Sequence, residues 1–426
     1  MIKQITLAGA LLVMGHLSFS QSIDQVINET EVARVERILS ADDMQGRKPF
    51  TPGIDKAAAF IAAEFKQAGL KPAKGKSFLQ AFTMLRTKFV AASGMVNGKA
   101  IEEKDIVGVT AKPNLTITQQ SKYKKMQVSK DSLYAVYGRL TKTKGNYLLV
   151  VDTNARGQFN NLKRRSTAFP PESNIIALLT MEDPATYSVA FTQEVTVMPL
   201  KNVVGILPGK SKKKEYVIFS GHYDHLGIGK PNAAGDSIYN GANDDAAGTT
   251  AVIMLAHYFA QQKNNERTIV FAAFTAEESG GFGSQYFSRQ FDPAKVMAMF
   301  NIEMIGTDSK WGNNSAFITG YEKTDMGKIL EKNLEGTNFK FYPDPYPQQQ
   351  LFYRSDNATL ARLGVPAHTI STSKMDSEKF YHTLDDEFET LDMKNMTEII
   401  KAIALSSTSI IAGRDTPSRV DASSLR

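Results

Sequence analysis

The sequence predicts an α/β protein with a three-layer α/β/α core, a mostly parallel mixed sheet and an additional β-rich region. Short, nearly continuous apolar runs recur at 216–219, 268–274 and 298–302, and a helix-like segment at 249–259 lies between the first two. Strands that are apolar on both sides and alternate with helices are typical of a sheet covered on both faces. The three apolar runs and the helix therefore predict the fold class.

The first residues have the pattern of a secretory signal. Met1-Ile2-Lys3 gives a positive start, residues 5–17 are largely apolar, and Ser18-Phe19-Ser20 offers small residues for cleavage. We therefore expect a signal peptide at 1–20 and a secreted or periplasmic mature protein. A membrane anchor is the alternative, but the apolar run is shorter than the roughly 20 residues that span a bilayer. No stable membrane insertion is expected.

The rest of the chain divides by its pattern. Apolar residues at helical spacing, such as Val32, Val35 and Leu39, precede a region of short alternating segments such as 115–118. The rhythm of strand, loop and helix begins near residue 200. We expect a helical part of the main domain at 21–85, a β-rich insertion at 86–199, the α/β core at 200–413 and a flexible tail at 414–426.

Composition narrows the chemistry. Hydrophobic residues make up 42% and charged residues 22% of the chain, which is ordinary for a globular protein. The absence of cysteine excludes disulfides, a thiol nucleophile and thiolate-ligated zinc, so any metal must be held by histidine and carboxylates. The net charge of +6 comes with only short basic runs that lack interleaved aromatic residues, so we expect no nucleic-acid partner.

Two polar motifs surround the predicted helix. Gly221-His222-Tyr223-Asp224 follows the first apolar run. A neutral imidazole there can ligate zinc, and Asp224 is close enough in the chain to hold its other N–H group. Asp244 lies in a turn of small residues, where it can bridge two cations or simply cap the helix that follows.

Acidic residues and a second histidine follow later strands. Glu277-Glu278 comes after the second run, and adjacent side chains point in different directions. One can therefore bind a metal while the other acts as a general base. Glu303 follows the third run, where a carboxylate between apolar neighbours is costly unless it is paired or metal-bound. A glutamate that turns to solvent at the strand end is the alternative. His382 lies beside Tyr381 in a polar loop.

Each motif alone has an ordinary structural explanation, such as a capped turn, a solvated helix start or a surface loop. Together they supply two histidines and three carboxylates, most of them at successive strand ends. Two zinc ions about 3.5–4 Å apart could then each take one histidine, one private carboxylate and one shared aspartate. The sequence thus predicts a two-metal hydrolytic site.

The order of these five motifs over about residues 200–400 resembles the M28 family of zinc aminopeptidases and related carboxypeptidases. The segment Asp42-Asp43-Met44-Gln45-Gly46-Arg47 is similar to the N-terminal part of that family. The resemblance implies a zinc-peptidase fold that binds two zinc ions per chain. The implied ligands are His222 and Glu303 on one ion, Glu278 and His382 on the other, and Asp244 between them, followed by a peptide that is often cis.

The resemblance also implies roles for residues around the metals. Glu277 matches the general base, Tyr381 matches a phenol that steadies the oxyanion, and Asp224 matches the acid behind His222. Glu303 stands where many members have aspartate, which puts the metal spacing in question. In place of 86–199, related enzymes often carry a protease-associated or lid domain.

We therefore expect a secreted zinc aminopeptidase that removes N-terminal residues from peptides with water activated by two zinc ions. A glutaminyl cyclase is one alternative, although Tyr223 and His225 stand where those enzymes typically have Trp and Ser. A glutamate-type carboxypeptidase is another, with Arg354 as the candidate for binding a carboxylate. A non-catalytic binding module would be expected to have lost ligands. Side-chain preference and oligomeric state stay open.

Overall fold

The computed structural model describes residues 22–163 and 167–425, so the expected signal peptide lies outside the described residues. The described chain forms two compact units. One runs up to Leu79 and resumes at Val203, and the other comprises Gln80–Asn202. The β-rich region expected at 86–199 falls within the second unit.

The first unit is built on a mixed sheet with the strand order β17-β16-β18-β15-β11-β14-β10. Strand β11 pairs in parallel with β14 and β15, and β15 pairs in parallel with β18, whereas β10 and β16 run antiparallel to their partners β14 and β18. This confirms the predicted mixed sheet. Its strands are β11 (Lys212–His222), β14 (Arg267–Phe274), β15 (Val296–Ile302), β16 (Ser315–Ile318), β17 (Lys340–Pro343), β18 (Ala367–Ser371) and the end of β10 (Tyr187–Leu207).

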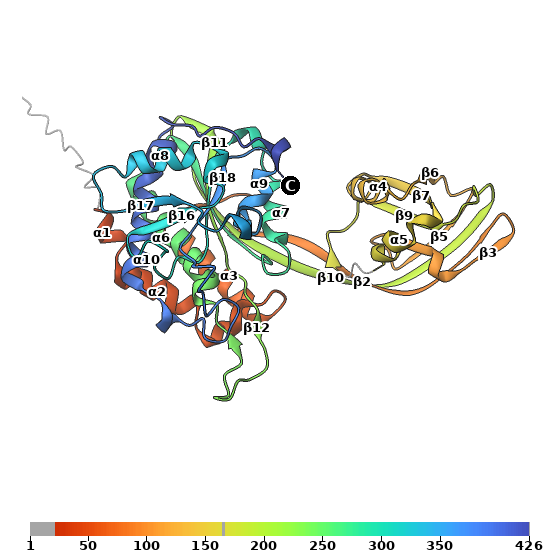
Figure 1. Cartoon of the computed structure of the whole chain (residues 1–426), viewed down its shortest axis with the longest axis horizontal. Helices are drawn as coiled ribbons and strands as arrows, with labels where there is room; N and C mark the ends of the chain where they lie inside the picture. Colours follow the sequence, from red (N-terminus) through yellow and green to blue (C-terminus); the bar gives the residue numbers. More distant parts are fainter. Residues whose placement is uncertain (1–21, 164–166, 426) are drawn as a thin grey trace, which may run out of the picture. The chain divides into compact units, whose positions relative to one another are not determined.

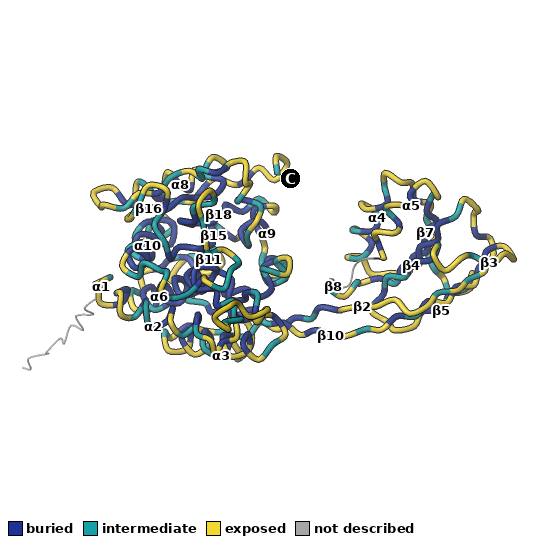
Figure 2. Tube along the Cα trace, turned by 60° about the horizontal axis from the view of Figure 1, so that its bottom comes forward, coloured by how far each residue is buried: buried dark blue, intermediate teal, exposed yellow. Residues whose placement is uncertain are grey.

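Helices cover both faces of this sheet (Figure 1). Alternate residues of each central strand enter different clusters: Phe219 packs with residues of α6 and α10, whereas Ile218 packs with residues of α7 and α9. Figure 2 shows β11, β15 and β18 mostly in the colour of buried residues. The helices of this unit are α1 (Ile23–Val26), α2 (Glu29–Leu39), α3 (Pro52–Gln67), α6 (Ala247–Gln262), α7 (Phe282–Ser288), α8 (Met326–Asn333), α9 (Asn357–Ala361), α10 (Met393–Ser406) and α11 (Thr408–Ile411).

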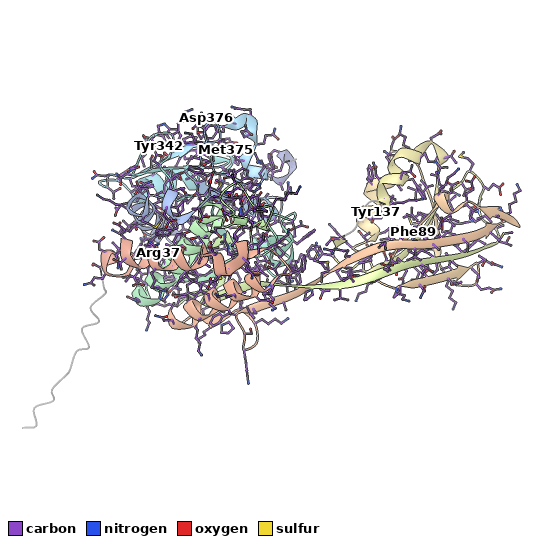
Figure 3. The ribbon with its side chains drawn as sticks, turned by 90° about the horizontal axis from the view of Figure 1, so that it is seen from below. Arg37, Phe89, Tyr137, Tyr342, Met375 and Asp376 are labelled. Carbon is purple, nitrogen blue, oxygen red and sulfur yellow. The ribbon has the colours of Figure 1, made fainter. Side chains whose placement is uncertain are left out.

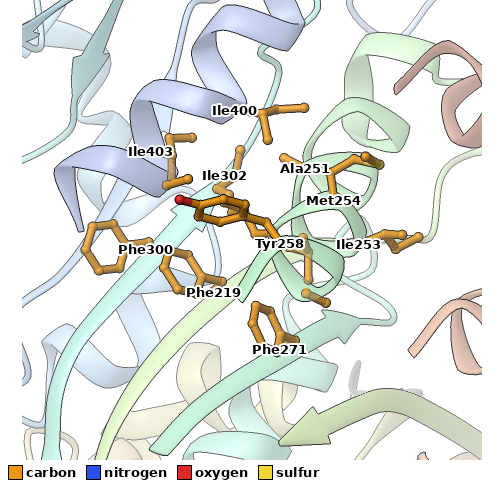
Figure 4. Packing of buried hydrophobic residues seen from close by; sticks show 14 of the residues in the cluster. Phe219, Ala251, Ile253, Met254, Tyr258, Phe271, Phe300, Ile302, Ile400 and Ile403 are labelled. Carbon is orange, nitrogen blue, oxygen red and sulfur yellow. The ribbon is translucent and has the colours of Figure 1, made fainter. Parts of the chain in front are cut away.

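Stacked aromatic rings fill the layer between the central strands and α6. The ring centroid of Phe219 lies 4.9 Å from that of Phe300, 5.8 Å from that of Phe271 and 5.6 Å from that of Phe259. Figure 4 shows Phe219, Phe271 and Phe300, from three neighbouring strands, gathered beneath the side chains of α6. This layer fixes the strands whose ends carry the candidate site.

The second unit has its own sheet, in the order β4-β9-β7-β6. Leu149 and its alternate neighbours pack on α4 and α5, while Leu148 packs in a cluster with residues of β5 and β10. The sequence predicted strands here but neither helix. The elements are β2 (Leu79–Val96), β3 (Lys99–Ile101), β4 (Ile106–Val109), β5 (Asn114–Thr118), β6 (Lys124–Val128), α4 (Leu133–Leu140), β7 (Gly145–Val151), α5 (Arg156–Leu162), β8 (Thr167–Ala168) and β9 (Ser173–Leu179).

The C-terminal segment differs from the flexible tail that was expected at 414–426. Val420 is buried, its backbone N–H donates to the carbonyl of Gly364, and Arg419 donates to the carbonyl of Val296 at 2.7 Å. The polar composition of this segment concealed the hydrogen bonds that attach it to the first unit. None of the helices within residues 22–163 and 167–425 is both long and apolar enough to span a bilayer.

Replacing Phe219 by alanine should lower the free energy of unfolding by about 3–5 kcal/mol, because it removes a fully buried ring from the aromatic layer. Urea unfolding followed by circular dichroism would measure the loss. Leu363→Ala is the control, since Leu363 is 49% exposed and should cost less than about 0.5 kcal/mol. Equal losses in the two variants would contradict the packing described here.

Candidate metal centre

Parallel pairing brings three candidate segments to one edge of the sheet. His222 is the last residue of β11, Glu277 and Glu278 follow β14, and Glu303 follows β15. Because β11 pairs in parallel with both β14 and β15, the carboxyl ends of the three strands lie at the same edge of the sheet. The backbone turns sharply near the candidate ligands, because Ala276 (57°), Met304 (53°) and, in a later loop, His382 (58°) have positive φ angles although they are not glycine. Such backbone conformations concentrate at functional sites.

Asp244 lies between the two candidate histidines. Its Oδ1 is 3.2 Å from Nε2 of His222, and its Oδ2 is 3.2 Å from Nε2 of His382. The Nε2 atom of His382 is also 3.0 Å from Oε1 of Glu278. The two oxygens of one carboxylate therefore face two separate groups of potential ligands. The Asp244–Asp245 peptide bond is cis, as the family resemblance implied.

Glu303 completes the group around His222. Suitable ligand atoms of His222, Asp244 and Glu303 all lie within 4.8 Å of one another. Within the described residues, Nε2 of His222 and Oε2 of Glu303 are buried and have no hydrogen-bond partner. Unsatisfied buried polar atoms are rare unless something else binds them.

The spacing of these atoms fits zinc. Ligands bound tetrahedrally at about 2.0–2.1 Å lie about 3.3 Å apart, close to the separations of 3.0–3.2 Å between the ring nitrogens and the carboxylate oxygens. All the donors are imidazole or carboxylate, which zinc accepts readily. The residues that the sequence singled out therefore form a set that could hold this metal.

Two buried aspartates that the sequence analysis did not assign hold the ligand segments in place. Asp245 accepts hydrogen bonds from the backbone N–H groups of His222 (3.1 Å), Gly248 (3.0 Å) and Met304 (3.1 Å). Asp386 accepts from the N–H groups of Asn243 and Asp244. Asp245 directly follows Asp244 and Asp386 lies four residues after His382, but only the folded chain reveals which backbone groups they bind.

Gly248, at the start of α6, has to be small for this arrangement. A Cβ atom there would lie 2.2 Å from the carbonyl oxygen of Ile302 and 2.4 Å from Oδ1 of Asp245. Contacts this short do not occur, so only glycine allows the helix to approach the end of β15 so closely.

Asp224 has a different contact from the one that was expected. The Nδ1 atom of His222 is 3.1 Å from the backbone carbonyl of Asp224 but 3.9 Å from its carboxylate. That carboxylate instead accepts a hydrogen bond of 3.0 Å from the backbone N–H of Glu277. Asp224 therefore steadies the imidazole through its main chain and the candidate base through its side chain.

Several of the clustered carboxyl groups have a raised pKa. Burial raises the pKa of Asp224, Glu303 and Asp386 to about 7 in each case. Burial also raises the pKa of Glu277 well above its usual value; the charge of His222 opposes this shift, and those of Glu303 and Asp356 add to it. Without a cation, these groups would hold their protons to a higher pH than ordinary carboxyl groups do.

The groups nearest the two histidines respond in the opposite direction. Hydrogen bonds to Asp244 and Glu278 raise the pKa of His382 to about 10. Burial works against ionisation of Asp244, but its close approach to His222 and His382 outweighs burial and lowers its pKa well below the usual value. Protonated imidazoles thus provide the positive charge that a bound metal cation would supply.

Arg47 connects the N-terminal part of the chain to this centre. Its guanidinium is fully buried and donates to the backbone carbonyls of Leu39, Tyr223, Asn240 and Gly241. One of these acceptors, Tyr223, adjoins His222, and Asn240 and Gly241 precede the turn that holds Asp244. The segment that resembled the N-terminal part of the family therefore supports both ligand loops.

Two further histidines of the described chain have structural contacts. His257 bonds Glu64 at 2.8 Å, and both ring nitrogens of His368 bond threonine oxygen atoms at 2.8 Å. His225 is buried at the centre, and its Nδ1 atom lies 3.1 Å from Oε1 of Glu278.

A cavity of about 60 Å³ adjoins Glu303. Met304 and Arg354 line it, whereas Ile305, Phe352 and Tyr353 do not. Met375, labelled in Figure 3, forms part of the wall. The full lining is Glu303, Met304, Phe317, Thr319, Leu351, Arg354, Ser355, Thr369, Ser371, Ser373, Met375 and Tyr381.

A histidine and carboxylate cluster at the carboxyl edge of an α/β sheet is an arrangement typical of two-metal hydrolases. Residues 202–406 match the model of peptidase family M28. The match confirms the family resemblance that the sequence motifs indicated for this part of the chain.

Curated relatives match over the same region. Leucine aminopeptidase 1 of Emericella nidulans is 27% identical over 211 residues, which are 47% of this chain and 53% of that protein. A probable leucine aminopeptidase of Trichophyton verrucosum is 28% identical over 209 residues, covering 47% and 54%. The chain thus spans about half the length of the curated relatives it matches.

Solved structures share the fold over most of their length. The aminopeptidase from Aneurinibacillus sp. strain AM-1 has a TM-score of 0.53 and 15% identity, covering 92% of this chain and 96% of that one. The zinc aminopeptidase BSAP from Bacillus subtilis has a TM-score of 0.53 and 14% identity, covering 90% and 95%. At these identities the likeness establishes the fold.

Replacing Asp245 by asparagine should lower zinc affinity about 10- to 100-fold although it removes no proposed ligand, because it disturbs three backbone hydrogen bonds that orient the ligand segments. Competition with a chromophoric chelator would measure the change. Asp385→Asn alters charge at an exposed neighbouring acid and should leave the affinity unchanged. Equal affinities for Asp245→Asn and the wild type would refute the anchoring role.

Proposed function

We propose that the chain is a zinc-dependent exopeptidase, acting as an aminopeptidase on peptides. The observation that carries the proposal is the position of Asp244, whose two oxygens face separate histidine and carboxylate groups. The match of residues 202–406 to the model of peptidase family M28 supports a peptide substrate. The leucine aminopeptidase names of the curated relatives favour cleavage at the N-terminus.

Two zinc ions are proposed per chain. His222 and Glu303 would hold one ion, Glu278 and His382 would hold the other, and Asp244 would contribute one oxygen to each. Zinc bound there would supply Lewis-acid chemistry that activates water near neutral pH. The longer side chain of Glu303, compared with the aspartate of many family members, still brings its carboxylate within 4.8 Å of the other two ligand atoms.

Glu277 is the proposed general base. It adjoins the ligand Glu278 without forming the short contacts that Glu278 makes, and Asp224 fixes its backbone N–H. Its carboxylate would accept a proton from the attacking water and return it to the leaving amine. Because cations near the site favour the ionised form of Glu277, metal binding would counteract the raised pKa that burial imposes.

Tyr381 is the proposed donor to the oxyanion. It lines the cavity beside Glu303, and its ring stacks on that of His382 with centroids 3.9 Å apart. Burial raises the pKa of Tyr381, and the negative charges of Asp244 and Glu278 raise it further, so the phenol keeps its proton. A protonated phenol at the edge of the cavity can donate a hydrogen bond to a developing negative charge.

The cavity beside Glu303 is the proposed position of the substrate side chain. Its wall combines Met304, Phe317 and Leu351 with several hydroxyl groups. We further propose that the protein acts after export, with the secretory pattern at 1–20 removed; this pattern lies outside the described residues.

A glutamate-type carboxypeptidase is the second candidate, and one observation favours it. Arg354 lines the same cavity, where its guanidinium could bind a substrate carboxylate. A glutaminyl cyclase is less well supported, because the chain's single tryptophan, Trp311, stacks on Tyr342 and does not line the cavity.

Replacing Glu277 by glutamine should lower kcat about 10²- to 10⁴-fold while zinc content stays unchanged, since the change removes the base but no proposed ligand. Steady-state hydrolysis of an aminoacyl anilide and metal analysis of the same sample would provide both readouts. Glu335→Gln, at an exposed position, should behave as the wild type. A fully active Glu277→Gln enzyme would exclude the assignment.

Peptides that differ only at their ends should show whether the enzyme removes residues from the N-terminus or from the C-terminus. A free N-terminus should be trimmed, an N-acetylated copy should resist cleavage, and a peptide that begins with glutamine should lose that residue as the free amino acid. Mass spectrometry distinguishes these products. Release of C-terminal glutamate, lost in Arg354→Ala, would instead establish the carboxypeptidase, and loss of ammonia alone would establish the cyclase.

A further inference from the structure

His225 is fixed at the centre of the metal site. It lies three residues after His222, its side chain is buried, and its backbone N–H donates to the carbonyl of Arg47 at 3.3 Å. Gly241 packs against the imidazole so closely that an added Cβ atom would lie 2.5 Å from ring carbons of His225. The ring is thus held with its Nδ1 atom toward Glu278.

The Nδ1 atom of His225 faces the same two oxygens as the proposed ligand His382. It is 3.1 Å from Oε1 of Glu278 and 3.9 Å from Oδ2 of Asp244. The corresponding distances from Nε2 of His382 are 3.0 Å and 3.2 Å. Ligand atoms of His225, Asp244 and Glu278 lie within 4.8 Å of one another. One nitrogen that approaches carboxylate oxygens from two chain segments has the position of a ligand around a shared ion.

We infer that His225, through Nδ1, is a further zinc ligand in the site formed by Asp244, Glu278 and His382. The inference rests on the proposed two-zinc site and adds a sixth protein ligand to it. The site around Glu278 would then have two imidazoles and two carboxylates, which is the full set of four that a closed zinc site uses.

The two metal positions would therefore be unequal. The position formed by His222, Asp244 and Glu303 has three protein ligands, as open catalytic zinc sites do. Glu303 also lines the cavity, whereas Glu278 and His225 do not. The substrate would accordingly meet the ion held by Glu303, and the ion held by His225 would chiefly organise the centre.

A hydrogen bond from Nδ1–H of His225 to Glu278 is the competing interpretation, and the two differ in the position of one proton. A ligand needs Nδ1 bare and the proton on Nε2, whereas a donor carries the proton on Nδ1. Asparagine places an amide N–H near the position of Nδ1 but is a poor zinc ligand. His225→Asn therefore preserves the hydrogen bond and removes the metal bond.

X-ray absorption at the zinc edge of the full-length, zinc-loaded protein tests the inference directly. The wild type should contain three imidazoles for every two zinc ions, and His225→Asn should contain two. A crystal structure of the same protein should place zinc about 2.0–2.1 Å from Nδ1 of His225. These wild-type measurements decide the question even if a variant folds poorly.

Zinc affinity provides the second readout. In chelator competition, His225→Asn and His225→Ala should both show an affinity for one of the two zinc ions that is lower by at least about 100-fold. Loss of a hydrogen bond to a ligand lowers metal affinity by about 10- to 100-fold, so the expected effect lies at or above the top of that range. His257→Asn, which alters a histidine bonded to Glu64, should keep both ions at the wild-type affinity.

The inference is overturned if the wild type holds two zinc ions with only two imidazoles, or if His225→Asn retains the wild-type affinity. Either result would make His225 a hydrogen-bond donor alone. Failure of the proposed function is a different result, namely a folded wild type that binds no zinc or cleaves no peptide.

Discussion

The candidate centre depends above all on the buried carboxylate of Asp245. It accepts hydrogen bonds from the end of β11, the start of α6 and the residue after Glu303. A sheet and a helix meet through this group, because Gly248 leaves just enough room for it. The ligands on either side have little freedom once these three backbone positions are fixed, which is how a rigid scaffold prepares a site for a metal.

Without a bound metal, the crowding of carboxylates at this centre lowers the stability of the fold. Asp224, Asp244, Asp245, Glu277 and Glu303 crowd into one buried region, where unpaired charges cost several kcal/mol each. The fold accommodates them by proton uptake and by contacts with imidazoles, as the raised pKa values near 7 of Asp224 and Glu303 indicate. A divalent cation relieves the repulsion without proton uptake, so metal binding and the native fold support one another.

Sequence patterns predicted the central strands, α6 and the nearness of the five proposed ligands. They succeeded because the apolar strands are short and three of those ligands lie at or close to strand ends: His222 ends β11, Glu303 follows β15 directly, and Glu278 lies four residues after β14. Other features depend on contacts between distant segments. Asp224 binds the backbone of Glu277, and His225 reaches Glu278, 53 residues away. The attachment of Arg419 to β15 likewise has no local signal, so the C-terminal segment was mistaken for a free tail.

Arg47 sets an order of events during synthesis of the chain. Its acceptors at Tyr223 and Gly241 lie 176 and 194 residues later. At about 5–20 residues per second, the ribosome needs roughly 9–40 s to make that stretch. Until then the two loops that the guanidinium supports do not yet exist. The metal centre is therefore a late product of translation, assembled only when the earliest part of the domain meets its last-made half.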